Sequence, residues 1–132
     1  MTSESVRGER VRRLMLVDDE PDINMALKVV LTRGGFSVDT FDDPIRAMEK
    51  IKPGYYDLLI LDIKMPGMDG FELYKEIKKM DPKAKVCFLT ASELYYEKLR
   101  PGDSPIPKDL FIHKPVPNTQ LLKKIKSLLE MD

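Results

Sequence analysis

The stretch Leu14-Met15-Leu16-Val17-Asp18-Asp19 is a run of four apolar residues that stops abruptly at two carboxylates. A short, continuous apolar run bounded by polar residues is typical of a β-strand that is buried on both faces. Pro21 follows closely, and proline is favoured in the first turn of a helix. Apolar residues then recur with helical spacing as far as Gly34-Gly35, where glycine favours a helix end. Residues 14–35 therefore predict a buried strand that leads into a helix.

The same alternation of apolar runs and helical patterns continues to the end of the chain. Further strands are predicted at residues 36–41, 58–61, 86–89 and 110–113. Further helices are predicted between Pro44 and Pro53, between Asp69 and Pro82, and over Leu121–Leu129. Strands that alternate with helices indicate βαβ units and a parallel sheet. The sequence therefore predicts an α/β fold with a doubly wound, five-stranded parallel sheet and four clear helices.

Length and composition indicate one globular domain and exclude several classes of protein. The chain has 132 residues, and its 22 Lys and Arg residues equal its 22 Asp and Glu residues in number. A neutral chain lacks bulk attraction to polyanions, so direct nucleic-acid binding is not expected. The single Cys87 excludes an intrachain disulfide and a cysteine metal cluster, and the single His113 excludes an HExxH metal motif.

The chain shows no targeting or membrane-spanning segment. No apolar run approaches the roughly 20 residues that span a bilayer, and residues 1–13 lack the apolar segment of a secretory signal. We therefore expect a cytoplasmic protein with no membrane partner. Residues 1–11 have little to bury and predict a disordered tail, which leaves residues 12–131 as the folded domain.

Polar side chains follow four of the predicted strands at the point where each strand ends. They are Asp18 and Asp19, Asp62, Thr90 and Lys114. Ligands of a doubly wound sheet bind beyond the carboxyl ends of the strands, so these side chains are expected at one edge. Clustered carboxylates repel one another, and a hard cation such as Mg²⁺ relieves that repulsion. With a lysine and a hydroxyl opposite, the set suits a phosphoryl group, which a carboxylate can accept as an acyl phosphate.

The motifs around these residues resemble the receiver domain of response regulators in two-component signalling, the CheY-like family. They are Leu16-Val17-Asp18-Asp19-Glu20, Asp62-Ile63-Lys64-Met65-Pro66-Gly67-Met68-Asp69-Gly70, Leu89-Thr90-Ala91 and His113-Lys114-Pro115. The resemblance covers about residues 12–130. It implies a flavodoxin-like fold with strand order 2-1-3-4-5. It also implies a signalling switch, or a phosphorelay intermediate, that is phosphorylated by a sensor histidine kinase or a phosphotransfer protein and acts on an unknown downstream protein.

The resemblance implies a metal site and an acceptor residue. Asp62 would be the phosphoacceptor, and it would hold Mg²⁺ together with Asp18, Asp19 and the main-chain carbonyl of Lys64. Asp19 would bind the ion directly, and Asp18 would bind it mainly through water. Such a domain catalyses only its own phosphorylation and its own dephosphorylation, so it is not expected to turn over an external substrate.

The resemblance also implies how the phosphoryl group is bound and detected. Thr90 and Lys114 would bind its oxygens, and the peptide bond between Lys114 and Pro115 would be cis. Phe111 occupies the position of the switch aromatic of the family. When Thr90 moves toward the phosphate, it would vacate space into which Phe111 could rotate.

The segment between Thr90 and Lys114 departs from the family pattern. Three prolines within seven residues disfavour a helix there, so the fourth helix is predicted to be short or irregular. Lys64 lies two residues after Asp62, and Ser92 lies two residues after Thr90. Both positions flank the expected phosphoryl group. We therefore expect them to modulate the lifetime of the acyl phosphate, with the Lys64 ammonium shielding it.

Two other functions are compatible with these residues. The first is an Mg²⁺-dependent phosphatase that works through an aspartyl phosphate. That class usually has a second acidic residue two positions after its nucleophile, where this chain has Lys64, and 132 residues leave no cap domain to shape a substrate pocket. The second is a degenerate receiver that acts only as a protein-interaction module, which the altered fourth helix favours slightly.

Single residues also have purely structural interpretations. Asp18 and Asp19 could cap the following helix, and Lys114 could be a solvated surface residue. His113 is interpreted as a packed strand side chain rather than as a phosphodonor. The occurrence of all the site residues at matching strand ends favours the functional interpretation.

Overall fold

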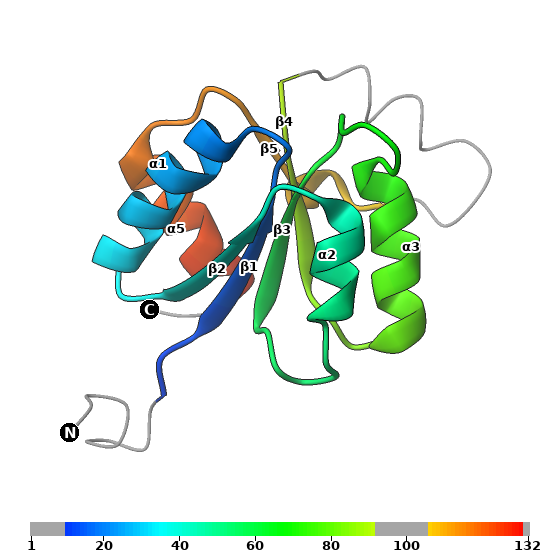
Figure 1. The fold of residues 1–132 in the computed structure, drawn as a ribbon. Helices are drawn as coiled ribbons and strands as arrows, with labels where there is room; N and C mark the ends of the chain where they lie inside the picture. Colours follow the sequence, from blue (N-terminus) through cyan, green and yellow to red (C-terminus); the bar gives the residue numbers. More distant parts are fainter. Residues whose placement is uncertain (1–9, 92–105, 131–132) are drawn as a thin grey trace.

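The computed structural model describes residues 10–91 and 106–130, which form one sheet flanked by helices (Figure 1). The strands are β1 (Arg13–Val17), β2 (Ser37–Phe41), β3 (Leu58–Asp62), β4 (Val86–Thr90) and β5 (Phe111–His113). The helical elements are α1 (Pro21–Arg33), α2 (Pro44–Glu49), α3 (Gly70–Met80), the 3-10 turn η2 (Lys108–Leu110) and α5 (Asn118–Leu128). All neighbouring strands are parallel, in the order β2-β1-β3-β4-β5. The predicted α/β fold and strand order are confirmed.

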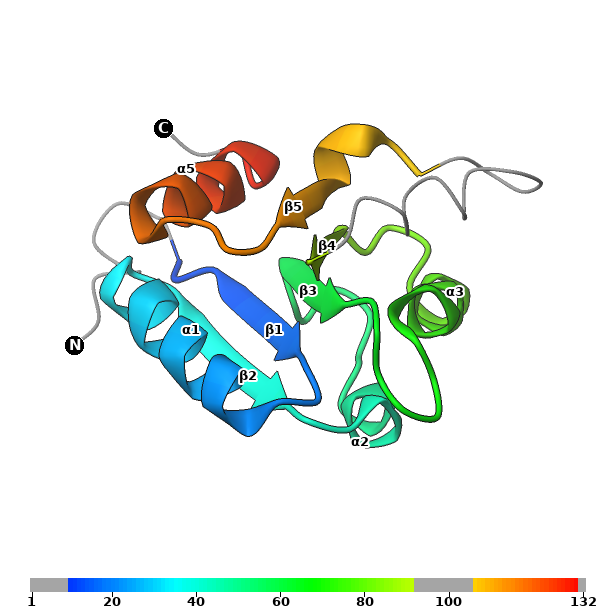
Figure 2. The ribbon, with the colours of Figure 1, turned by 90° about the horizontal axis from the view of Figure 1, so that it is seen from above.

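Helices cover both faces of the sheet, with α1 and α5 on one side and α2 and α3 on the other (Figure 2). Side chains alternate between the faces of a strand, so each central strand contributes to two apolar cores. In β1, Leu14 and Leu16 belong to the core on the α1 and α5 side, whereas Met15 and Val17 belong to the core on the α2 and α3 side. This double burial explains why the central strands are continuous apolar runs.

Asp69 caps α3 and holds the loop that follows β3. Its side chain accepts hydrogen bonds from the main-chain N–H groups of Phe71 and Glu72, both at 2.9 Å. The Glu72 carboxylate accepts in return from the Asp69 N–H, also at 2.9 Å. This reciprocal arrangement is a capping box, which satisfies donors that the first helical turn leaves unpaired. The helix start predicted from Asp69 is thereby confirmed.

The end of α2 and the start of β5 are among the predicted element boundaries that differ from the structure. Helix α2 ends at Glu49 rather than near Pro53, because the Lys50 N–H turns back to the carbonyls of the last helical turn. The spacing of Ile45, Met48 and Ile51 predicts one apolar helix face, but the side chain of Ile45 is 48% exposed. Strand β5 begins at Phe111, since the preceding Lys108–Leu110 form a 3-10 turn.

Parts of the predicted organisation lie outside the described residues. These are residues 1–9 of the predicted tail and the predicted irregular fourth helix, which falls on residues 92–105. Within the described part, the guanidinium of Arg10 forms an ion pair with Asp57. No helix among the described residues is long and apolar enough to cross a bilayer.

Gly70 allows the start of α3 to pack directly against the end of β3. Its N–H donates to the Ile63 carbonyl at 2.8 Å. A Cβ atom at this position would lie 2.3 Å from the Asp62 carbonyl oxygen and 2.9 Å from the Ile63 Cα. Both are main-chain atoms, so no side-chain rotation relieves the overlap. The absence of a side chain at Gly70 therefore sets how closely α3 approaches Asp62.

We expect Gly70→Ala to lower the midpoint of thermal unfolding by about 5–10 °C, which corresponds to about 2 kcal/mol of overpacking. Gly34→Ala is the matched control, because its Cβ would meet mainly the flexible end of the Leu122 side chain. We expect a clearly smaller shift for this control. Differential scanning calorimetry measures both, and an unfolding midpoint of Gly70→Ala equal to that of the wild type would contradict the packing argument.

Candidate functional site

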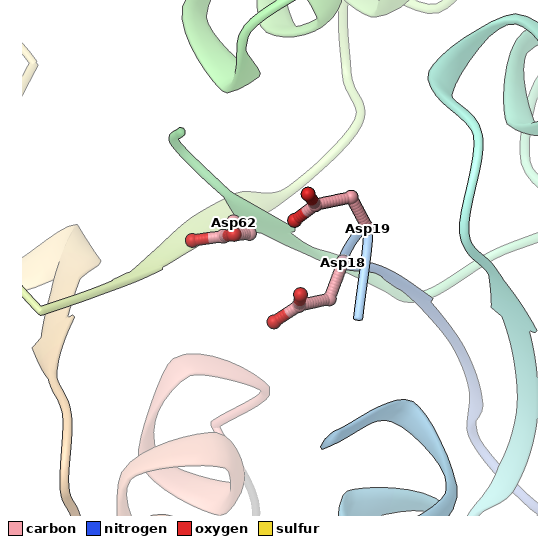
Figure 3. A group of neighbouring side chains, drawn as sticks. All are labelled: Asp18, Asp19 and Asp62. Carbon is pink, nitrogen blue, oxygen red and sulfur yellow. The ribbon is translucent and has the colours of Figure 1, made fainter. Parts of the chain in front are cut away.

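Three carboxylates from two neighbouring strands converge at the carboxyl edge of the sheet (Figure 3). Asp18 and Asp19 directly follow β1, and Asp62 is the last residue of β3, which pairs with β1. One carboxylate oxygen from each residue lies within 4.8 Å of the others. Asp18 and Asp62 are buried, and Asp19 is half-buried. Ionised carboxylates at this separation repel one another unless a cation or a proton compensates.

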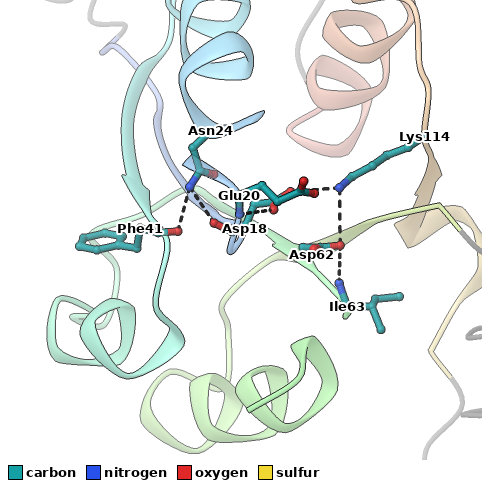
Figure 4. Close-up of polar contacts among 7 residues, drawn as sticks. All are labelled: Asp18, Glu20, Asn24, Phe41, Asp62, Ile63 and Lys114. Atoms are coloured by element: carbon teal, nitrogen blue, oxygen red, sulfur yellow. Dashed lines mark hydrogen bonds and ion pairs between the residues drawn. The ribbon is translucent and has the colours of Figure 1, made fainter. Parts of the chain in front are cut away.

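Lys114 directly follows β5, the edge strand next to β4, and its side chain points toward the carboxylates of Asp18 and Asp62 (Figure 4). Its Nζ donates a hydrogen bond to Asp18 Oδ2 at 3.0 Å and lies 3.6 Å from Asp62 Oδ1. Its main-chain N–H donates to the Thr90 carbonyl at 2.8 Å, and the peptide bond to Pro115 is cis. The side chain is 20% exposed. Lys114 is therefore a site residue and not a solvated surface lysine.

The two oxygens of Asp62 have different surroundings. Oδ1 accepts a hydrogen bond from the Ile63 N–H at 2.9 Å and faces Lys114. Oδ2 has no hydrogen bond or ion pair with the residues of the described ranges 10–91 and 106–130. The carboxylate lines a pocket of about 720 Å³. The pocket walls include Asp19, Lys64, Met65, Thr90 and Lys114. Asp62 thus presents one oxygen to a cavity that can hold a small ligand.

Burial and charge set the protonation behaviour of the site. Burial raises the pKa of Asp62 to about 6, and the negative charge of Asp18 contributes to the same shift. Lys114 and the Ile63 N–H oppose this shift without cancelling it. Burial alone would lower the pKa of Lys114, but the hydrogen bond to Asp18 and the charge of Asp62 outweigh it and raise that pKa. The lysine therefore stays charged, and the carboxylates outnumber it.

Of the other residues predicted near the phosphoryl group, Thr90 and Lys64 line the pocket. Thr90 ends β4, is 3% exposed and lines the pocket. Lys64 also lines the pocket, with an exposed side chain. Ser92 lies outside the described residues. Thr90 and Lys64 therefore flank Asp62 on the walls of the same cavity.

Phe111 lies on β5, three residues before Lys114, in a group of aromatic rings. It is half-buried and stacks on Phe88 of β4 with a centroid distance of 5.2 Å and an interplanar angle of 23°. The Phe71 ring of α3 lies 6.2 Å away. His113, two residues later on β5, is exposed. The prediction that His113 is a packed side chain is wrong, because its side chain is exposed at the end of β5, the last strand of the sheet.

One buried polar residue beside the site was not predicted. Asn24 of α1 is 4% exposed, and its side-chain amide reaches the main chain at the end of β1. The sequence does hold a signal for it, since Asn24 shares the helical face of Leu27 and Leu31. An uncharged polar residue on an otherwise apolar helix face indicates a buried hydrogen bond. The contacts that the Ile63 and Glu20 N–H groups make with the carboxylates have no such signal.

The pKa of Asp62 makes a prediction for the metal-free protein. The folded protein holds the Asp62 proton up to about pH 6, whereas the ordinary value for an unfolded chain is 3.8. Stability therefore falls as the pH rises from about 4 to about 6 and stays low above this range. Replacing the carboxylate by an amide, in Asp62→Asn, removes the repulsion. We expect the variant to be more stable by about 3 kcal/mol near pH 7.5 and by about 1 kcal/mol near pH 4.5.

Urea unfolding in the presence of EDTA measures this difference. Asp109→Asn is the control, because Asp109 is exposed in η2, at the opposite end of the strands from the carboxylates. We expect its stability to follow the wild type at both pH values. A gain in Asp62→Asn that does not change with pH would show that charge repulsion is not its cause.

Comparison with known proteins identifies the family. The model of the response regulator receiver domain matches residues 14–126. The response regulator receiver protein CpdR of Brucella abortus is 32% identical over 120 residues, which cover 90% of this chain and 98% of CpdR. The transcriptional regulatory protein DltR of Streptococcus agalactiae is 34% identical over 114 residues, which cover 86% of this chain. The chain spans about half the length of DltR, since the match covers 50% of that protein.

Solved structures agree with the family match. The response regulator TrrA of Thermotoga maritima, crystallised in complex with Mg(2+)-BeF, superposes with a TM-score of 0.76 at 37% identity. That alignment covers 89% of this chain and 99% of TrrA. A CheY-like receiver domain from Methanospirillum hungatei gives a TM-score of 0.77 at 29% identity and covers 92% of this chain and 95% of that one. The chain therefore belongs to the receiver domain family of two-component response regulators.

Proposed function

We propose that this domain is a phosphorylation-activated switch that accepts a phosphoryl group on Asp62 in an Mg²⁺-dependent reaction. One observation carries the proposal. Three carboxylates lie within 4.8 Å of one another, and the Lys114 ammonium lies 3.6 Å from Asp62 Oδ1. Residues 12–131 would form the functional unit, in agreement with the family match to residues 14–126.

The acidic cluster has the chemistry of an Mg²⁺ site. Asp18, Asp19 and Asp62 offer only oxygen donors, which hard cations prefer, and the main-chain carbonyl of Lys64 would add a fourth. The complex of the related TrrA with Mg(2+)-BeF supports this assignment. When bound, the ion would compensate the carboxylate repulsion and stabilise charge on a transferred phosphoryl group.

The side chains at the pocket would support transfer of a phosphoryl group from a phosphohistidine to Asp62. An oxygen of Asp62 attacks phosphorus, an O–P bond forms, and the bond to the nitrogen of a phosphohistidine breaks with its electron pair on that nitrogen. The donor would be a sensor histidine kinase or a phosphotransfer protein. Lys114 and the Thr90 hydroxyl would bind the phosphoryl oxygens. Attack of water on the acyl phosphate would then return Asp62 and inorganic phosphate without an external substrate.

The modification would change the packing around β4 and β5. Thr90 is 3% exposed and ends the strand that carries Phe88, on which Phe111 stacks. A movement of Thr90 toward the phosphoryl group would open space for the half-buried Phe111 ring. Thr90 and Phe111 would together form the two-state element that a downstream protein detects.

The proposal predicts an adduct that depends on both Asp62 and metal. On incubation with acetyl phosphate and Mg²⁺, we expect intact mass spectrometry to show a gain of about 80 Da, the mass of one PO₃ group. The adduct is absent in Asp62→Asn and in EDTA, and it is retained in Asp109→Asn. Turnover of phosphomonoesters would point instead to a phosphatase. The absence of both an adduct and turnover would leave a domain that acts only through protein interaction.

We also propose that Lys64 prolongs the life of the acyl phosphate, since its exposed side chain lines the pocket beside Asp62. Removing the ammonium gives water easier access, so we expect Lys64→Ala to lose the adduct about threefold faster, a typical effect of one exposed electrostatic contact. Lys79→Ala is the control, because Lys79 is an exposed α3 residue paired with Glu76. Ser92 is the second proposed modulating position. Equal decay in Lys64→Ala and the wild type would refute the role of Lys64.

A further inference from the structure

We propose that Asn24 is a positioning residue of the metal site: its side-chain amide fixes the turn that carries Asp18 and Asp19 and thereby raises the affinity for Mg²⁺. The inference rests on the proposed function and adds to it a residue outside the carboxylate cluster. Its basis is the set of contacts that Asn24 makes with the ends of two strands (Figure 4).

The amide nitrogen of Asn24 joins α1 to β1 and β2. It donates to the carbonyl of Asp18 at 2.8 Å and to the carbonyl of Phe41 at 3.2 Å. Asp18 directly follows β1, and Phe41 is the last residue of β2. The Phe41 carbonyl also accepts from the Asp18 N–H at 3.1 Å. The buried Asn24 side chain therefore connects helix α1 both to Asp18, at the end of β1, and to the end of the neighbouring strand β2.

The amide oxygen of Asn24 shows that the nitrogen is the functional part of the side chain. Within the described residues, Oδ1 is buried and has no hydrogen-bond partner. A buried polar atom without a partner destabilises a fold, so an apolar side chain would serve better if Asn24 only filled space. The reverse orientation of the amide would place its oxygen against two carbonyl oxygens and is repulsive. The contribution of Asn24 therefore comes from the two bonds of its nitrogen.

These bonds complete the fixation of Asp18. Its carboxylate is already held on both sides, with Oδ1 accepting from the Glu20 N–H at 3.0 Å and Oδ2 accepting from Lys114 Nζ at 3.0 Å. Those contacts orient the side chain, whereas the Asn24 contact holds the main-chain carbonyl. Without it, the peptide between Asp18 and Asp19 can rotate, and the Asp19 carboxylate must then be ordered when the ion binds. That ordering lowers affinity, because supporting contacts of this kind preorganise metal ligands.

Calorimetric titration with Mg²⁺, without a phosphodonor, tests the inference. We expect Asn24→Ala and Asn24→Leu to bind Mg²⁺ about tenfold more weakly than the wild type. Alanine suits a helix, and leucine fills the space of the amide, so at least one of the two variants is expected to fold. Leu27→Ala is the matched control, since Leu27 lies one turn further along α1 and packs against the apolar core. Its unfolding midpoint falls, but we expect its Mg²⁺ affinity to stay within about twofold of the wild type.

The outcomes separate this inference from the proposed function. An Mg²⁺ affinity of both Asn24 variants equal to that of the wild type would overturn the positioning role alone. An equal loss of affinity in Leu27→Ala would also overturn it, because the effect would follow stability rather than the amide contacts. If the wild type bound no Mg²⁺, the proposed function would fail and the inference with it. At saturating Mg²⁺ we expect the Asn24 variants to recover the wild-type yield of acyl phosphate. A lower yield at saturating Mg²⁺ would instead indicate that Asn24 acts on the reacting atoms and would overturn the positioning role.

Discussion

The mutual repulsion of three carboxylates at one edge of the sheet is the constraint on which the rest of the site depends. Asp18, Asp19 and Asp62 are held close enough for one cation to bind all three. Burial and the neighbouring charges raise the pKa of Asp62 to about 6, and Lys114 offsets this only in part. The repulsion destabilises the metal-free fold, and the same energy becomes available to bind a cation. The negative charge of the carboxylates exceeds the positive charge of Lys114, so the site favours binding of an added cation.

Such a site persists only because the surrounding framework is rigid. The strands β1 and β3 carry the carboxylates and are buried on both faces, so their ends cannot move apart without opening two cores. At the start of α3, Gly70 packs on the Asp62 carbonyl and Asp69 closes the capping box. At the start of α1, Asn24 bonds to the main chain of Asp18. Two helix starts thus support the two strand ends from opposite faces of the sheet.

Sequence patterns predicted the elements that local periodicity determines. The central strands were evident because burial on both faces demands a continuous apolar run, and Asp69 identified the start of α3. The apolar periodicity gave wrong predictions where tertiary packing determines which side chains are buried and where a strand begins. Ile45 has the spacing of a buried helical residue but is 48% exposed, and residues 108–110 turn before β5 begins. His113 is exposed although Ile112, its neighbour on β5, is buried, and no short stretch of sequence encodes this difference.

The amino-acid sequence alone determined which side chains end or directly follow the strands, and so which of them, namely Asp18, Asp62, Thr90 and Lys114, are candidates for the site. Only the tertiary structure decided their distances and partners. Lys114 lies 96 positions from Asp18 along the chain, yet its Nζ bonds to that carboxylate at 3.0 Å. Periodicity reports how each segment is buried, whereas contacts of this kind depend on strand order, strand register and the packing of helices across the sheet. The raised pKa of Asp62 has the same origin, because it arises from burial and from charges brought together by folding.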